Sequence, residues 1–129
     1  MAKDATVTAY VEAPLCTGAK QELAKQGSHA GELRVQAICL PTPRDQGKLK
    51  LSTLGANARR ATEDSTAVAY LEASDPRASK FTHPILETAE IPWISGGSGK
   101  AAMARLLQLI EDSGSGSLRA SIREALRET

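Results

Sequence analysis

The alternation of strand-like and helix-like segments constrains the fold of this chain most strongly. Segments rich in β-branched and apolar residues, which is typical of strands, cover residues 6–13, 32–40, 66–72 and 91–95. Segments with apolar residues at helical spacing cover residues 18–27, 51–64, 77–90, 100–112 and 117–128. Strands that alternate with helices form a mainly parallel sheet with helices on both faces. We therefore expect a three-layer α/β fold with about four strands and about five helices.

The length and charge of the chain narrow its class. At 129 residues it is long enough for one domain and too short for two lobes, so we expect a single flavodoxin-like lobe over residues 1–129. Its formal net charge of +1 gives no electrostatic reason to expect nucleic acid or a membrane as a partner. No apolar run reaches the roughly 20 residues of a membrane span. Residues 1–15 lack the features of a signal peptide, so we expect a cytoplasmic location for the chain as expressed.

The cysteines and histidines predict no metal site. The chain has two cysteines, Cys16 and Cys39, and two histidines, His29 and His83, and their spacing is not that of zinc ligands. Cys39 falls in an apolar segment, where a free cysteine behaves as a small hydrophobe. We expect free thiols, with a bridge between the two cysteines as the open alternative.

The stretch "SGGSGK" has the outline of a phosphate-binding loop but departs from its pattern. In a P-loop, a leading glycine, four residues and Gly-Lys are followed by a serine or threonine that binds magnesium. Here Ile94 stands where the leading glycine belongs, and Ala101 follows Lys100. We expect residues 95–99 to be a flexible joint, with weak anion binding at the start of the next helix as the alternative.

The other chemical residues do not assemble into a catalytic set. Asp75 follows the third strand, where a response-regulator receiver would carry its phosphoacceptor, but Glu12 alone does not supply the acidic pair that a receiver also needs. His83 has no serine or cysteine elbow before it. We therefore expect no enzyme activity, no catalytic residues and no cofactor.

Five stretches of the sequence occur in the order known from one protein family: "GELRVQAICL", "NARRATED", "AVAYLE", "HPILETAEIP" and "WIS". Through them most of the chain resembles the amino-terminal lobe of type 1 periplasmic binding proteins, and most of all the leucine/isoleucine/valine-binding receptors of ABC importers. The tail "AAMARLLQLIEDSGSGSLRASIREALRET" is similar to the late helix pair that returns to that lobe. The resemblance implies an amino-acid-binding, non-catalytic transport receptor whose natural relatives are periplasmic or extracellular.

The departures from the family are informative. A ligand-contacting serine or threonine of the family falls on Pro76, which has no donor, and the second lobe is replaced by residues 95–99. The resemblance leaves five residues for a weak, residual ligand site: Ser74, Ser79, Ser95, Ser98 and Gly99. It implies a single-lobe derivative, engineered or truncated, with little or no ligand affinity because one lobe cannot enclose a ligand.

Two other functions stay open. The chain could be a small-ligand binder that takes an amino acid or an anion weakly at the loops after the strands. A nucleotide-binding enzyme is the third reading, but it rests on topology alone, and topology does not determine function. The expected state is a monomer or a homodimer.

Overall fold

The computed structural model describes residues 5–73, 75–96, 98–113 and 118–127. Five helices and seven strands lie in these ranges. In chain order they are β1 (Thr6–Val11), α1 (Ala13–Lys25), β2 (His29–Ala30), β3 (Leu33–Cys39), β4 (Arg44–Asp45), β5 (Lys48–Leu49), α2 (Leu51–Thr62), β6 (Ala67–Ala73), α3 (Pro76–Thr88), β7 (Trp93–Gly96), α4 (Gly99–Asp112) and α5 (Leu118–Arg127).

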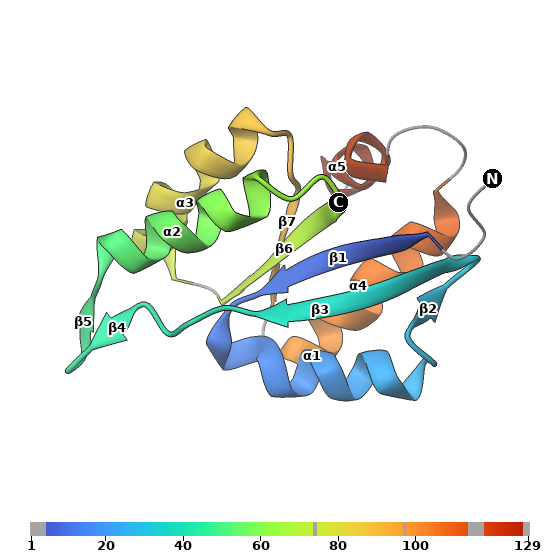
Figure 1. Cartoon of the computed structure of the whole chain (residues 1–129), viewed down its shortest axis with the longest axis horizontal. Coiled ribbons are helices and arrows are strands. Elements are labelled where there is room, and N and C mark those ends of the chain that lie inside the picture. Colours follow the sequence, from blue (N-terminus) through green and yellow to red (C-terminus); the bar gives the residue numbers. More distant parts are fainter. Residues whose placement is uncertain (1–4, 74, 97, 114–117, 128–129) are drawn as a thin grey trace.

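A five-stranded sheet in the order β2-β3-β1-β6-β7 forms the centre of the molecule (Figure 1). The strands β3, β1, β6 and β7 run parallel to one another, and these are the four strands that the sequence predicts. The short β2 pairs antiparallel with the start of β3 and was not predicted. The expected α/β class, with its mainly parallel sheet and five helices, is therefore confirmed.

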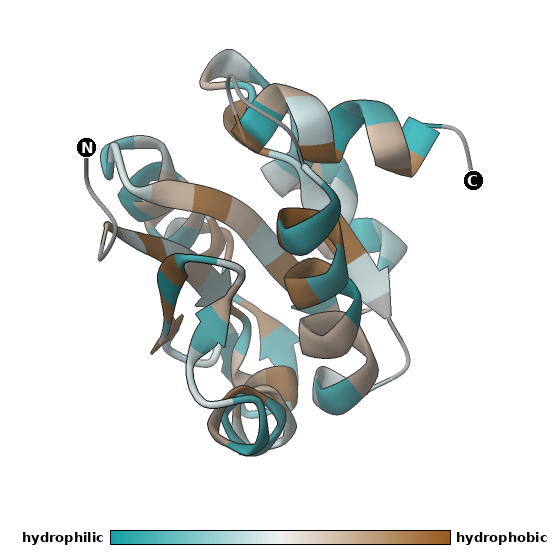
Figure 2. Cartoon of the chain, turned by 90° about the vertical axis from the view of Figure 1, so that its right-hand side faces the viewer, coloured by the Kyte–Doolittle hydropathy of each residue, from teal (hydrophilic) through white to brown (hydrophobic). Residues whose placement is uncertain are grey.

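Two apolar clusters cover the two faces of the sheet. The larger one joins the sheet to α1, α4 and α5 through residues such as Leu15, Met103 and Ile122. The smaller one contains Ala58 of α2 and Leu86 of α3, packed around the fully buried Tyr70 of β6. Hydrophobic and hydrophilic residues are interspersed along the helices (Figure 2), as one buried and one exposed face requires. This burial on both faces explains why β6 is apolar almost throughout.

The first helix begins at Ala13, whereas the sequence predicts a loop there and a helix from residue 18. Pro14 occupies one of the first two helical positions, where its missing N–H costs no hydrogen bond. Leu15, Cys16 and Ala19 then form a buried face of α1 one turn earlier than expected. The predicted stop is confirmed, because Gly27 follows the helix with a φ of +75°.

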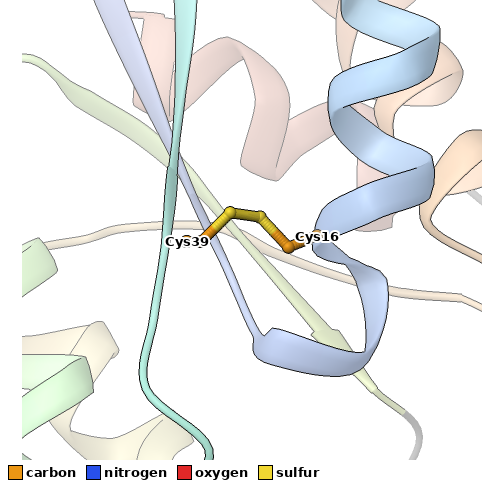
Figure 3. The surroundings of a disulfide bond; sticks show 2 residues. All are labelled: Cys16 and Cys39. Carbon is orange, nitrogen blue, oxygen red and sulfur yellow. A yellow bond between two sulfur atoms is a disulfide. The ribbon is translucent and has the colours of Figure 1, made fainter.

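Cys16 and Cys39 form a disulfide, so the expectation of free thiols is wrong (Figure 3). Their Cα atoms are 5.7 Å apart, a usual separation for a disulfide. The early start of α1 is the physical reason, because it brings the first turn of the helix beside the end of β3. Cys39 is also exposed rather than buried in the core.

Two further details differ from the prediction. The prolines and the glycine of "PTPRDQGK", residues 41–48, predict a loop, but most of this stretch belongs to the hairpin β4–β5, whose turn residues Gln46 and Gly47 both have positive φ, as a type I′ turn requires. Phe81, Ile85 and Leu86 lie at helical spacing in the sequence, which predicts one buried face, but Phe81 is 37% exposed. Pro84 lies inside α3, although proline is best tolerated in the first turn of a helix.

Candidate functional site

The carboxyl ends of the central parallel strands bring polar side chains together at one edge of the sheet. Glu12 directly follows β1, Glu72 lies near the end of β6, and Ser95 lies near the end of β7. Glu72 and Ser95 are register partners in the β6–β7 pair. In open parallel sheets this edge is where ligands bind, so it is the candidate functional site.

Glu72 is the residue that several polar side chains of this site contact, and it is almost completely buried, with 2% exposure. The Nε2 of His83 lies 2.8 Å from one carboxylate oxygen of Glu72 and 3.0 Å from the other. Ser79 Oγ lies 3.4 Å from the carboxylate, and Ser95 Oγ donates a short hydrogen bond to it. Three side chains therefore provide hydrogen-bond partners for a carboxyl group that would otherwise be buried without them.

The face of the His83 ring packs against the ring of Trp93. The two rings stack with their centroids 3.8 Å apart and their planes 13° from parallel. Trp93 belongs to β7 and His83 to α3, so the stack connects the helix to the last strand of the sheet. This contact fixes the direction in which the imidazole faces Glu72.

Glu12 is a second buried carboxylate at the same edge, with 6% exposure. The hydroxyl of Tyr70 donates to it over 3.1 Å, and the backbone N–H of Ala73 donates over 2.9 Å. Burial raises the pKa of Glu12 above its usual range, although both hydrogen bonds act in the opposite direction. Burial, together with the nearby charge of Glu12, also raises the pKa of the Tyr70 hydroxyl.

A cavity of about 310 Å³ opens beside Glu12. Its charged lining residues besides Glu12 are Arg44, Asp75 and Arg77. Asp75 caps α3 by accepting from the N–H of Arg77 over 3.0 Å, and it also forms an ion pair with Arg44. Burial acts to raise the pKa of Asp75, but the amide of Arg77 and the two arginine charges outweigh it and hold the pKa below its usual range.

The structure brings two of the predicted ligand residues together and places two others elsewhere. Ser79 and Ser95 meet on Glu72, whereas Ser98 is the N-cap of α4 and accepts from the N–H of Ala101 over 3.1 Å. Gly99 is the first residue of α4 and packs against the backbone of α1, and Ser95 belongs to β7, so these described residues of the stretch expected to be a flexible joint, 95–99, lie in regular elements. Ser74 lies outside the described residues.

Sequence reasoning missed Glu72 as a functional residue. The one available signal was a carboxylate in an otherwise apolar strand, "AVAYLEA", because such a charge must find partners inside the fold. From the sequence, His83 is a candidate only for a catalytic set. His83 contacts Glu72, which lies 11 residues earlier in the chain. This contact depends on where α3 begins, and the spacing of the two residues in the sequence does not predict it.

At this site the polar side chains of Glu72, His83 and Ser95 already have hydrogen-bond partners within the protein. Ser79 and Ser95 both donate to Glu72 rather than to His83, so neither serine is activated by the imidazole. In the described ranges no three His, Cys, Asp or Glu side chains are grouped so that they could hold a metal ion. No helix of the described chain combines the length and apolar character that crossing a membrane requires.

Comparisons with known proteins found no protein-family model, no curated protein and no solved structure that matches this chain.

Proposed function

We propose that the chain is a non-catalytic single lobe, engineered or truncated, that derives from an amino-acid-binding receptor of the ABC-importer type. In this proposal it has little or no affinity for small ligands. The second lobe of such a receptor would be replaced by residues 95–99, and hinge closure would be lost with it.

The observation that carries the proposal is that the hydroxyls of Ser79 and Ser95 both donate hydrogen bonds to Glu72. The resemblance assigns both serines to the ligand, yet their hydroxyl protons are directed to a buried carboxylate. A ligand that accepted those protons would leave Glu72 with fewer partners, which costs about 1–3 kcal/mol for each buried group left unsatisfied. The network therefore opposes binding of an acceptor group at this position.

Two further features support the ancestry. The parallel strands run in the order β3-β1-β6-β7, which is the second-first-third-fourth order of flavodoxin-like lobes. The Cys16–Cys39 disulfide also fits descent from a periplasmic or extracellular protein, because disulfides persist in oxidising compartments.

A second candidate function is weak binding of an amino acid or an anion. The cavity of about 310 Å³ beside Glu12 favours it, since the cavity lies at the sheet edge where such folds bind ligands. Its charges are already paired within the protein, as the Arg44–Asp75 ion pair shows. A ligand would have to exchange these contacts for equivalent ones, so we expect a dissociation constant of about 1 mM or weaker, or about 4 kcal/mol of binding free energy at most.

Titration of the isotope-labelled protein with leucine and with valine, followed by nuclear magnetic resonance, tests the proposal. We expect the backbone amides of residues 72–75 and 77–79 and the indole of Trp93 to stay unshifted at millimolar ligand. Saturable shifts confined to these groups, with a dissociation constant below about 0.1 mM, would contradict it. The variant Ser95→Ala is the matched control, because a genuine ligand contact through this hydroxyl would be lost with it.

A further inference from the structure

The Cys16–Cys39 disulfide has one side that solvent reaches and one that it does not. In the described part of the chain, β2 pairs with β3 only through Leu33 and Arg34, so the later half of β3 is an edge of the sheet. Cys39 ends that strand and is exposed. Cys16 is only 6% exposed and belongs to the larger apolar cluster. Of the two cysteines, Cys39 is therefore the one that an incoming thiol can reach.

The sulfur of Cys16 is placed to leave as a thiolate. Cys16 is the fourth residue of α1, within the first turn, where the helix dipole stabilises negative charge. That turn contains no acidic residue, and the N-cap Glu12 makes no side-chain capping bond. The carboxylate of Glu12 is instead occupied by Tyr70 and by the amide of Ala73. The dipole at a helix N-terminus stabilises a thiolate and makes it a better leaving group, whereas burial among apolar residues acts in the opposite direction, so departure as a thiolate requires the dipole to outweigh the burial of Cys16.

We propose that the Cys16–Cys39 disulfide is a thiol–disulfide exchange site, which a small thiol or dithiol reduces in the folded protein by attack on Cys39. The inference does not depend on the proposed receptor ancestry. It assigns the disulfide a reactive role in addition to its structural one.

The exchange proceeds in two steps. A thiolate of the dithiol attacks Sγ of Cys39 and forms a mixed disulfide, while the bond to Cys16 breaks and its electron pair stays on Sγ of Cys16. The second thiolate of the dithiol then attacks its own bound sulfur and releases Cys39 as a thiolate. The protein gains two electrons, and the dithiol is oxidised to its disulfide. With a monothiol such as glutathione, the first step leaves a mixed disulfide on Cys39.

Reduction of the disulfide would loosen one wall of the cavity at the carboxyl ends of the strands. Pro14, in the first turn of α1, and Glu12, just before it, both line that cavity. The disulfide fastens this turn to the end of β3 (Figure 3). Reduction breaks this covalent link, so the redox state of the two cysteines determines whether the first turn of α1 is covalently attached to β3.

The first test measures reduction of the folded wild-type protein by dithiothreitol, and its mixed disulfide with glutathione by peptide mass spectrometry. We expect native reduction within about tenfold of the rate in the unfolded chain, with the glutathione adduct on Cys39. Reduction that proceeds only at the rate of global unfolding would overturn the proposal, as would an adduct on Cys16.

The second test measures the leaving group. The variants Cys39→Ser and Cys16→Ser each leave one thiol, and the pH midpoint of its alkylation reports its thiolate pKa separately from its accessibility. We expect the midpoint of Cys16 to lie below that of Cys39 and below the ordinary value of about 8.5. An equal or higher midpoint for Cys16 would overturn the proposal. The reduced wild-type protein, with both alkylated peptides quantified, gives the same two midpoints if a variant fails to fold.

Discussion

Replacing Gly99 by alanine tests whether the glycine-rich stretch is a packed part of the fold. A Cβ at Gly99 would lie 2.7 Å from the backbone nitrogen of Ala19 and closer still to the carbonyl oxygen of Leu15. Both atoms belong to the backbone of α1, so no side-chain rotation relieves the clash. Restoring ordinary contact at 3.4 Å requires α1 and α4 to separate by at least about 0.7 Å.

The cost of that separation follows from the interface that it opens. The two helices pack through buried apolar residues that include Leu23 of α1 and Leu107 of α4. A gap of about 0.5–1 Å forfeits a quarter to a half of each dispersion contact. Overpacking costs about 1–3 kcal/mol, and because the closest atoms are backbone atoms we expect the upper end, a loss of about 3 kcal/mol in the free energy of unfolding for Gly99→Ala. For a chain of 129 residues the melting temperature would fall by about 11 °C.

Urea unfolding followed by circular dichroism, with the disulfide intact, is the assay. Two matched variants calibrate it. Gly18→Ala places a Cβ 3.1 Å from the nitrogen of Lys100 and should cost clearly less than Gly99→Ala. Lys100→Ala, at an exposed position in the same turn, should stay within about 0.5 kcal/mol of wild type. A Gly99→Ala protein as stable as the lysine variant would refute the packing of α4 on α1.

Three further predictions concern the disulfide and the two buried carboxylates. Cys39→Ser removes a cross-link between residues 23 positions apart and should lower the free energy of unfolding by about 3 kcal/mol, measured by urea unfolding against the oxidised wild type. His83→Ala removes a partner of the buried Glu72 and should cost about 2 kcal/mol at pH 7; a loss below about 0.5 kcal/mol would contradict the network. Because burial raises the folded-state pKa of Glu12, the stability that it contributes is complete below its unfolded pKa of about 4.3 and declines as pH rises through the folded pKa. The variant Glu12→Gln should lose this decline in pH-dependent urea unfolding, and an unchanged pH profile would argue against a buried, neutralised Glu12.

Local pattern predicted the parallel strands well because each is a run of β-branched and apolar residues. Val7, Ala9 and Val11 on β1 are all buried, but so are Thr8 and Tyr10 between them, because helices cover both faces of the sheet. The start of α1 could not be predicted in the same way. Thr17 and Gly18 interrupt the apolar pattern locally, and the glycine is explained only by α4, which packs against it from 82 residues further along the chain.

The candidate site was only partly predictable for a related reason. Ser79 and Ser95 were found from the resemblance, but their partner Glu72 was not. A carboxylate inside a strand acquires its role from residues that the fold brings to it, and His83 and Ser95 come from α3 and β7. The disulfide was missed because it depends on the position of the first turn of α1, which local periodicity placed too late.

Thermal unfolding of the oxidised protein with and without millimolar leucine, valine, phosphate or ATP tests the proposed absence of ligand affinity most directly. A ligand present at 100 times its dissociation constant adds about 2.7 kcal/mol to the free energy of unfolding. For 129 residues this raises the melting temperature by about 10 °C. We predict one cooperative transition that none of the four ligands moves. A rise of several degrees with leucine or valine alone would contradict the proposal and show that the half-site at Glu72 still binds an amino acid.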